Sequence, residues 1–406
     1  MMYGLIGKTL KHSFSKDIHE KLGYGYELLE LAPEELDDFF KKRDFKGINV
    51  TIPYKESVIK YLDETDDGVK TIGACNTIVN KNGRLFGYNT DYTAAKSLIA
   101  RQNVPIKGKK ALILGTGGTS KTYYHALKAL GAAEIYKVSR TPHENEISYE
   151  EAYEKHSDAG IIANTTPVGM FPNTNAAPID ITRFTKLSLT VDAIYNPLRT
   201  EFVLNSQKRG IVSCGGLYML AAQGVYAAEH FGKCKADENT IGGIYSSLLR
   251  GKRNIVFIGM PSAGKSTIAR LLDKNFFDTD LEIQKQTGAS PKEIIEEWDE
   301  AGFRKKESEI IERLSLKNGL VVATGGGAVL DEKNVINLKK NGIIIYLDAP
   351  LERLAATEDR PLSKNPELLK KLYDQRKDIY CAAADVIINA DGSIDGTLSK
   401  VKEALK

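Results

Sequence analysis

The sequence contains few of the residues that define disulfide-rich or metal-binding proteins. Its 406 residues include four cysteines, one tryptophan and six histidines. Cys75, Cys214, Cys234 and Cys381 form no CxxC pair, and the histidines show no ligand spacing. A disulfide framework and a zinc site are therefore not expected, and a reducing cytoplasm fits this cysteine usage.

Long apolar runs and an excess of charge are also missing. The most apolar stretch, Leu217–Ala228, is interrupted by Gln223 and is much shorter than the roughly 20 residues of a membrane-spanning helix. Met1-Met2-Tyr3 leads into a strand-like segment without a basic region or a cleavage site, so no signal peptide is evident. Lys and Arg number 56 against 53 Asp and Glu, which does not suggest a nucleic-acid-binding protein.

Short β-rich apolar runs alternate with helical patterns along most of the chain. This alternation predicts an α/β protein with parallel sheets covered by helices, and the length allows two or three domains at roughly 150 residues each. Glycine-rich loops follow two of the strand-like runs, starting at Gly115 and Gly259. Each loop would found its own open sheet, so two nucleotide sites are expected, with a boundary at residues 250–253.

The first glycine-rich loop has the pattern GxGGxS. Gly115, Gly117 and Gly118 would let backbone N–H groups approach a pyrophosphate at a helix N-terminus, although such a turn also occurs in α/β folds without a nucleotide. The following strand ends in Ser139-Arg140-Thr141, where an NAD site usually has an acid. Arg140 would pair with a 2′-phosphate, so NADP is favoured over NAD, while the nearby Glu144 weakens that preference.

Small hydroxyl and amide residues recur at the predicted strand ends before this loop. They occur in the segments 11–15, 47–55, 72–77 and 87–91. Side chains of this kind suit a polyhydroxylated substrate, which needs many directional hydrogen bonds.

These segments resemble, in order, the signature motifs of shikimate dehydrogenases. The resemblance continues through segments 164–170, 192–197 and 216–223 and covers residues 1–250. It implies reduction of 3-dehydroshikimate to shikimate by NADPH, with Lys55 and Asp91 as catalytic residues. A Lys55 ammonium group can stabilise and protonate the alkoxide that hydride addition forms, and Asp91 can orient it. For the substrate contacts given next, helix capping or structural hydrogen bonding is the alternative role. The resemblance implies substrate contacts by Ser13, Ser15, Thr51, Asn76, Tyr195 and Gln223, and cofactor contacts by Gly115, Thr116, Gly117, Gly118, Thr119, Ser139, Arg140, Thr141, Ala193 and Gly216.

The second loop, Gly259–Thr267, fits GxxxxGK[ST] fully and lies between a predicted strand and a predicted helix. This pattern predicts an ATP site in which Lys265 reaches the β and γ oxygens and Ser266 binds Mg²⁺. Its short domain favours a small-molecule kinase. Asp278 and Asp280 follow the next strand, where one carboxylate suits Mg²⁺ and the other an acceptor hydroxyl, unless the pair only caps a helix.

Residues 254–406 resemble shikimate kinases. The resemblance rests on the second loop, Asp278-Thr-Asp280, segments 300–307 and 325–327, Arg360-Pro-Leu362 and segment 376–380. It implies that Asp280 is the base, that Asp278 lies near Mg²⁺ and that Arg360 acts from a lid. It implies substrate contacts by Arg304, Gly326 and Arg376, and nucleotide contacts by Pro261, Ser262, Ala263, Gly264, Lys265, Ser266 and Thr267.

Three positions depart from the two families. Tyr92 follows Asp91 where the first family usually has glycine, the lid near Arg360 is short, and Asp299 replaces a usual glycine. A ligand sensor without chemistry, a chain with one inactive half, and a first half that prefers quinate or NAD therefore remain alternatives.

The expected architecture has three modules. They are a substrate domain at residues 1–100 with 217–249 returning to it, a Rossmann-like NADP domain at 101–216, and, after a linker at 250–253, a P-loop kinase domain at 254–406 with a five-stranded parallel sheet. The expected ligands are NADP(H), ATP, Mg²⁺, 3-dehydroshikimate and shikimate, with no nucleic acid or membrane. Whether the chain forms a homodimer is left open.

Overall fold

The computed structural model describes residues 2–10, 13–273, 276–354 and 365–405, apart from a few side chains between residues 291 and 298. The chain divides into two compact units. The first unit contains residues 1–195 and 205–249, and the second contains residues 196–204 and 250–406. No helix among the described residues is both long enough and apolar enough to cross a membrane.

The first unit opens with a mixed six-stranded sheet in the order β2-β1-β3-β5-β6-β4. Its strands are β1 (Met2–Gly7), β2 (Glu27–Glu30), β3 (Phe45–Val50), β4 (Glu64–Thr65), β5 (Thr77–Lys81) and β6 (Arg84–Tyr88). The expectation of wholly parallel sheets is wrong here, because β5 runs antiparallel to both β3 and β6. Asn82 and Gly83 connect β5 to β6 with φ of 54° and 87°, the left-handed values that a tight hairpin turn requires.

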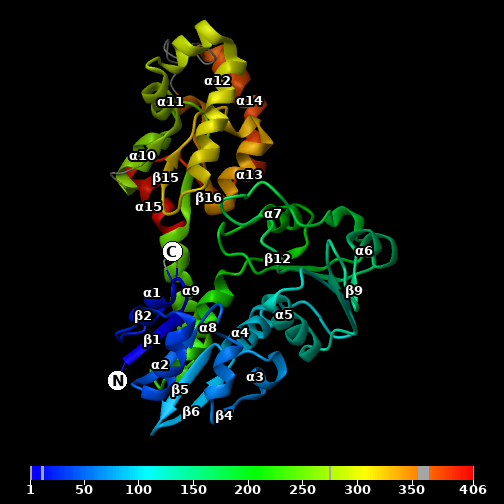
Figure 1. Cartoon of the computed structure of the whole chain (residues 1–406). Helices are drawn as coiled ribbons and strands as arrows, with labels where there is room; N and C mark the ends of the chain where they lie inside the picture. The colour runs from blue at the N-terminus through cyan, green and yellow to red at the C-terminus, as the bar shows by residue number, and fades with distance from the viewer. Residues whose placement is uncertain (1, 11–12, 274–275, 355–364, 406) are drawn as a thin grey trace. The chain divides into compact units, whose positions relative to one another are not determined.

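Several helices pack on this sheet, and one of them comes from much later in the chain. The helices are α1 (Ser15–Lys21), α2 (Leu36–Lys42), α3 (Asp67–Ile72), α4 (Thr90–Ala100) and α8 (Leu217–His230). Figure 1 shows α8, in green, beside the blue strands. Two glycines make the close approach possible: a Cβ on Gly47 would lie 2.3 Å from the Phe231 ring, and one on Gly224 would lie 2.7 Å from Ile18.

The second sheet of the first unit is parallel throughout, in the order β12-β11-β10-β7-β8-β9. Its strands are β7 (Lys110–Leu114), β8 (Glu134–Val138), β9 (Glu146–Ile147), β10 (Ile161–Asn164), β11 (Leu189–Asp192) and β12 (Val212–Cys214), with helices α5 (Gly118–Ala129) and α6 (Tyr149–Lys155). Strands β10 and β11 are buried along their whole length, as expected for a sheet covered on both faces. The strand order reverses at β7, so the loop after it lies where open α/β sheets bind ligands.

The second unit contains a parallel five-stranded sheet in the order β14-β15-β13-β16-β17, which confirms the predicted strand number and direction. The strands are β13 (Asn254–Ile258), β14 (Phe277–Asp278), β15 (Val321–Ala323), β16 (Gly342–Asp348) and β17 (Val386–Asn389). The helices are α10 (Lys265–Leu272), α11 (Thr279–Thr287), α12 (Pro291–Ser315), α13 (Glu332–Asn341), α14 (Pro366–Ala383) and α15 (Ile394–Ala404).

Two longer helices and five short ones complete the described elements. Helices α7 (Glu201–Lys208) and α9 (Glu238–Lys252) each contain residues of both units. The 3₁₀ helices are η1 (Pro33–Glu35), η2 (Ser57–Tyr61), η3 (Ile181–Arg183), η4 (Ala328–Leu330) and η5 (Leu351–Arg353).

Candidate active sites

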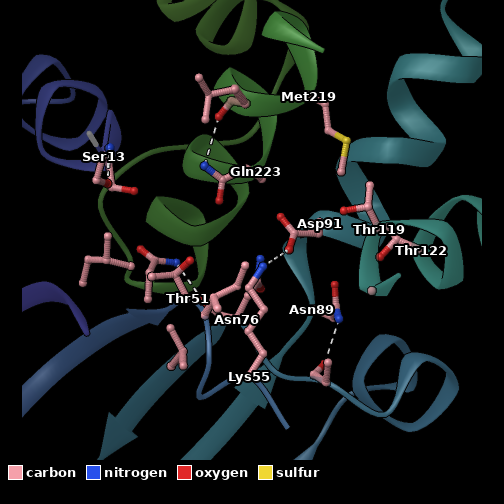
Figure 2. Close-up of a pocket in the computed structure, with 18 of the residues that line it drawn as sticks. Ser13, Thr51, Lys55, Asn76, Asn89, Asp91, Thr119, Thr122, Met219 and Gln223 are labelled. Carbon is pink, nitrogen blue, oxygen red and sulfur yellow. Dashed lines mark hydrogen bonds and ion pairs between the residues drawn. The ribbon is translucent and has the colours of Figure 1, made fainter. Parts of the chain in front are cut away.

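A cavity of about 830 Å³ opens in the first unit where the ends of β3 and β5 face α5 and α8. Figure 2 shows polar side chains around it, from α4, α5 and α8 and from the segments next to the strands. Eight residues singled out for catalysis or substrate binding line the cavity: Ser13, Ser15, Thr51, Lys55, Asn76, Asp91, Tyr195 and Gln223. Four of the ten residues singled out for the cofactor also line it: Gly118, Thr119, Ala193 and Gly216.

Lys55 and Asp91 form an ion pair on the wall of this cavity. The Lys55 Nζ lies 2.7 Å from Asp91 Oδ2, and the two side chains are 32% and 22% exposed. Asp91 occupies the first turn of α4, and the Asn89 side chain caps that helix by accepting a hydrogen bond from the Tyr92 N–H. The position of Asp91 is therefore fixed by the helix start, and Tyr92 continues the helix in place of the usual glycine. Both side chains line the cavity and are partly exposed, and Figure 2 marks the ion pair between them.

A buried amide network holds the strand ends beside this pair. Asn76 is 3% exposed, and its Oδ1 accepts a 2.8 Å hydrogen bond from the Thr90 N–H. The Asn49 Nδ2 donates to the Asn76 carbonyl at 3.1 Å, and the Asn89 Nδ2 donates to the Ala74 carbonyl at 2.7 Å. These bonds join β3, the start of β5 and the start of α4, so they fix the floor of the cavity.

Residues from distant parts of the chain form the rest of the cavity wall. The Ser13 Oγ accepts a hydrogen bond from the Ser15 N–H at 3.2 Å, and the Gln223 Nε2 donates to the Leu220 carbonyl at 3.0 Å. The ring of Tyr195 packs edge-to-face against Phe14, with 5.9 Å between the centroids. Burial raises the pKa of Tyr195, so its hydroxyl stays protonated and can act as a donor at neutral pH.

The first glycine-rich loop leads into the N-terminus of α5. Gly115 has a φ of +98° and lies against Thr165 and Thr166, so the fold itself requires glycine there. A Cβ on Gly117 or Gly118 would meet no protein atom within 4 Å. Packing therefore does not require these two glycines, whereas the close approach of a phosphate would. Thr116 lies between Gly115 and Gly117 and is exposed.

Gly216 contributes a second close approach at the cavity. A Cβ there would lie 2.2 Å from the carbonyl oxygen of Ala193, and the Gly216 N–H bonds the Ile194 carbonyl at 2.8 Å. Only glycine lets the start of α8 lie this close to the end of β11.

The segment proposed to read the 2′-phosphate lies outside the cavity lining, beyond β8. Arg140 and Thr141 are exposed, and the Ser139 Oγ bonds the N–H and the carbonyl of Thr141 at 3.3 and 3.1 Å. These bonds shape a tight turn that presents Arg140 to solvent. The Glu146 side chain closes the same loop by accepting from the His143 N–H at 3.1 Å.

Sequence reasoning missed several cavity residues. Asn49, Asn89, Met219 and the pair Glu56 and Lys121 all line the cavity. The Lys121 Nζ lies 3.5 Å from Glu56 Oε1. Glu56 follows Lys55, and Lys121 lies near the start of α5. Asn89 stands two residues before Asp91, and this helix-capping position was the signal for its role.

In the second unit, the P-loop has the backbone that a phosphate cradle needs. Gly259, Ser262 and Gly264 have φ of 141°, 65° and 87°. Lys265 begins α10, is 8% exposed, and donates from Nζ to the carbonyls of Gly259 and Met260 at 2.9 and 2.8 Å. Pro261, Ala263 and Thr267 complete the loop and the helix start.

Two carboxylates flank this loop at the end of β14. The Ser266 hydroxyl donates a hydrogen bond to Asp278 Oδ2. The other Asp278 oxygen caps α11 by accepting from the N–H groups of Asp280 and Leu281 at 3.0 and 3.3 Å. Asp278 therefore does cap a helix, which was one of the two roles considered from the sequence. The same carboxylate also accepts the hydrogen bond from Ser266 of the P-loop. Asp280 faces the glycine segment 325–327, because a Cβ on Gly325 would lie 2.8 Å from its Oδ1.

Gly325, Gly326 and Gly327 bring the remaining predicted residues together. A Cβ on Gly327 would lie 2.2 Å from the Arg304 guanidinium, and one on Gly326 would lie 3.0 Å from Pro261. Arg376 is 6% exposed and donates to the Gly326 carbonyl at 3.0 Å. The segment thus connects the P-loop with two arginines.

Glu307 is a further residue of this site that sequence reasoning missed. Its side chain is fully buried, and its Oε2 accepts a 2.7 Å hydrogen bond from Arg304 Nη1. Burial raises the pKa of Glu307, although the Arg304 guanidinium opposes the shift. Its position three residues after Arg304, one helical turn away, was the available signal. Arg360 and its proposed lid lie outside the described residues.

Comparison with known proteins identifies relatives of both units. A family model for the shikimate dehydrogenase substrate binding domain matches residues 5–78, and one for shikimate kinase matches residues 261–406. A shikimate dehydrogenase (NADP(+)) of Clostridium beijerinckii is 36% identical over 260 residues, which cover 60% of this chain and 96% of that protein.

Solved structures resemble the same part of the chain. A chorismate mutase/shikimate 5-dehydrogenase fusion protein from Clostridium acetobutylicum is 35% identical, with 61% of this chain and 96% of that chain covered and a TM-score of 0.56. Shikimate 5-dehydrogenase from Thermus thermophilus, solved with NADP(H) and shikimate, is 30% identical, with 61% of this chain and 99% of that chain covered and a TM-score of 0.53.

Proposed function

Because the chain belongs to the shikimate dehydrogenase family and continues into a shikimate kinase domain, we propose that it catalyses two consecutive reactions of the shikimate pathway. The first is reduction of 3-dehydroshikimate to shikimate with NADPH, and the second is phosphorylation of shikimate to shikimate 3-phosphate with ATP. The 2.7 Å Lys55–Asp91 pair, on the wall of a cavity that extends to the N-terminus of α5, is the main support for the first reaction.

In the first reaction, the cofactor supplies a hydride to the substrate carbonyl. The chain's own residues must then stabilise and protonate the alkoxide that results. Lys55 provides the positive charge and the proton, and Asp91 holds the ammonium group in place and takes part in the proton transfer. Thr51, Asn76 and Gln223 bond the hydroxyls of the substrate, while Ser13, Ser15 and Tyr195 bind its carboxylate. We also assign Asn89 to the substrate hydroxyls, because its amide lines the same wall.

The helix α5 and the turn after β8 hold the cofactor in this proposal. The N-terminus of α5 at Gly117–Thr119 attracts the pyrophosphate, and the missing Cβ atoms of Gly117 and Gly118 leave room for it. Gly216 and Ala193 border the nicotinamide. Arg140, which is exposed on its turn, pairs with the 2′-phosphate and favours NADP over NAD.

In the second reaction, the chain's residues hold the two substrates in line for phosphoryl transfer. Lys265 leaves its loop carbonyls to bind the β and γ phosphates, and Asp280 accepts the proton of the shikimate hydroxyl. Arg304 and Arg376 clamp the substrate carboxylate, and Gly326 bonds a hydroxyl through its backbone. Arg360 neutralises charge on the transferred group.

Ser266 and Asp278 fit a magnesium ion, because a hydroxyl and a carboxylate already meet beside the P-loop. Among the described residues, no three His, Cys, Asp or Glu side chains gather as a metal site. A Mg²⁺ held by one serine, one carboxylate through water, and phosphate oxygens needs no such group. When bound, the ion would neutralise charge on the phosphates.

The cellular context is also part of the proposal. All four cysteines are free thiols, which agrees with a reducing cytoplasm. We expect small-molecule partners, and a homodimer is one assembly to test by light scattering.

A one-pot assay with 3-dehydroshikimate, NADPH, ATP and Mg²⁺ tests the proposal. Mass spectrometry should detect shikimate 3-phosphate. The variant Lys55→Met should abolish product formation from 3-dehydroshikimate but not from added shikimate, whereas Asp280→Asn should stop the reaction at shikimate. Binding of all ligands without any turnover would support the sensor alternative. Faster turnover of quinate than of shikimate in the reverse direction would replace the proposed first substrate.

A further inference from the structure

The second unit contains a short segment from the middle of the dehydrogenase sequence. Residues 196–204, here named the clasp segment, group with residues 250–406 and not with the residues before and after them. They directly follow Tyr195 and lie within the range that the sequence assigns to the NADP domain. Sequence order alone gives no reason for this grouping, so the contacts of the segment must explain it.

Arg199 makes the main contacts. Its guanidinium forms a two-pronged pair with Asp385, with Nη1 3.0 Å from Oδ1 and Nη2 3.2 Å from Oδ2. The Nε donates to the Lys339 carbonyl at 2.9 Å, the backbone N–H donates to the Lys340 carbonyl at 2.8 Å, and Nη2 donates to the Gly342 carbonyl. The Arg199 and Asp385 side chains are each only 23% exposed.

These carbonyls belong to the end of helix α13 and the first residue of β16. The last carbonyls of a helix have no partner within the helix and carry the negative end of its dipole. Arg199 therefore caps α13 with both hydrogen bonds and charge. The Leu198 N–H adds a 2.9 Å hydrogen bond to the Asn341 side chain at the same helix end.

Two charges of the P-loop unit are neutralised by the clasp segment. Lys340 is 1% exposed, and its Nζ lies 3.2 Å from Glu201 Oε1. Asp385 also accepts a 2.9 Å hydrogen bond from the Ile344 N–H, so it holds the ends of β16 and β17 together. Within residues 250–406, Lys340 also donates to the Asn337 side chain at 3.0 Å, but this neutral amide does not balance its charge. Because a buried charge is costly unless it is paired, the unit without the clasp segment would lose the ion pairs of both groups.

We propose that the clasp segment is an essential part of the kinase unit. The segment supplies the C-cap of α13 and the counter-charges of Asp385 and Lys340. The kinase unit is therefore not complete within residues 250–406. The two proposed enzymes cannot be separated at the linker without loss of kinase stability, even though each has its own site.

Variants of the full-length chain test this proposal. The unfolding of the second unit can be followed by hydrogen exchange in its largely buried strands β13 and β16 as the temperature rises. Arg199→Ala should lower the thermal midpoint of the second unit by roughly 5–10 °C, because the partly buried Asp385 loses its ion pair and the helix-end carbonyls lose their donors. The control Lys370→Ala removes the ion pair with Asp374, whose side chains are 64% and 58% exposed, and should change the midpoint by about 1 °C or less.

Three further experiments distinguish a specific cap from general damage. Arg199→Lys keeps the positive charge but cannot form the two-pronged pair with Asp385. Its thermal midpoint should lie between those of the original chain and Arg199→Ala. The double variant R199M/D385N removes both charges and should recover part of the loss. Hydrogen exchange should accelerate at residues 339–344 in Arg199→Ala and not in Lys370→Ala. None of these readouts needs catalytic activity, so they do not depend on the proposed function.

An unchanged midpoint in Arg199→Ala would overturn the proposal. So would a double variant that is less stable than Arg199→Ala, because the loss would then come from packing and not from the stranded charge. Unchanged exchange at residues 339–344 would show that the clasp segment does not cap α13.

Discussion

Gly327→Ala should damage the kinase site selectively, through a single added methyl group. Its carbon would lie 2.2 Å from Arg304 Nη2 and 2.3 Å from both Cζ and Nη1. Ordinary carbon contacts need about 3.5 Å, so the guanidinium must move by more than roughly 1 Å. Arg304 is held by Glu307 at 2.7 Å and by Glu300 at 3.2 Å, so the move breaks these bonds and misplaces the arginine proposed to clamp the substrate carboxylate.

The size of the effect follows from the interaction that is lost. A hydrogen bond to a charged group contributes about 1.5–3 kcal/mol, which corresponds to a rise of roughly 10–150-fold in the KM for shikimate. The KM for ATP should change little, because Gly327 lies on the Arg304 side of the segment. Steady-state kinase assays measure both constants, and dehydrogenase activity in the same sample verifies the enzyme concentration.

Gly392→Ala is the matched control, since a Cβ there meets no atom within 4 Å. A shikimate KM of Gly327→Ala within a factor of about three of the control would refute the proposed geometry, because the lost bond predicts at least roughly 10-fold. An equal rise in the KM for ATP would instead show that the whole loop has shifted.

Three other predictions concern catalysis, acid stability and backbone strain. Lys55→Met should lower the dehydrogenase kcat by about 10²–10⁴-fold and leave kinase activity intact, and an unchanged kcat would exclude Lys55 as the proton donor. Burial raises the pKa of Asp385, but the Arg199 guanidinium, the Ile344 N–H and the charge of Lys339 together hold it below its ordinary value. The unfolded state therefore binds more protons on acidification. This contribution is full above the ordinary pKa and is lost as the pH falls below about 4, so Asp385→Asn should flatten the acid limb of a urea-unfolding series. Asp299→Gly should stabilise the second unit by about 1 kcal/mol in denaturant titrations. A residue with a side chain pays about 1–3 kcal/mol for a φ of 77° with a ψ of 172°. The loss of the hydrogen bond to the Gly302 N–H and the greater chain entropy of glycine offset part of this gain. Asp299→Ala loses the cap and keeps the strain, so it should be less stable than the original chain.

Local motifs made much of the fold and of both candidate sites predictable. The strands Glu134–Val138, Ile161–Asn164 and Asn254–Ile258 are short, β-rich segments of the kind that predicts the alternating α/β pattern. The P-loop needs glycine at fixed positions, and its spacing therefore identifies it.

Other features depend on contacts that no local pattern encodes. The strand Arg84–Tyr88 was missed although Asn82-Gly83 is a strong hairpin signal, because the neighbouring segments favoured parallel strands. Glu307 is fully buried beside Arg304, but a glutamate on a charged helix looks like a solvated residue in the sequence. Arg199 meets Asp385 across 186 residues, and only the folded chain shows why an arginine stands there.

The same long separation affects how the protein is made. Chains grow at about 5–20 residues per second, so roughly 10–40 s pass between the synthesis of Arg199 and that of Asp385. During this interval the clasp segment lacks its Asp385 partner, and the closure of such a long loop has an entropic cost that the completed contacts must offset. A chain that stops before Asp385 lacks the carboxylate that the clasp binds, whatever the state of its first unit. The contacts that complete the kinase unit can therefore form only after Asp385 has been synthesised.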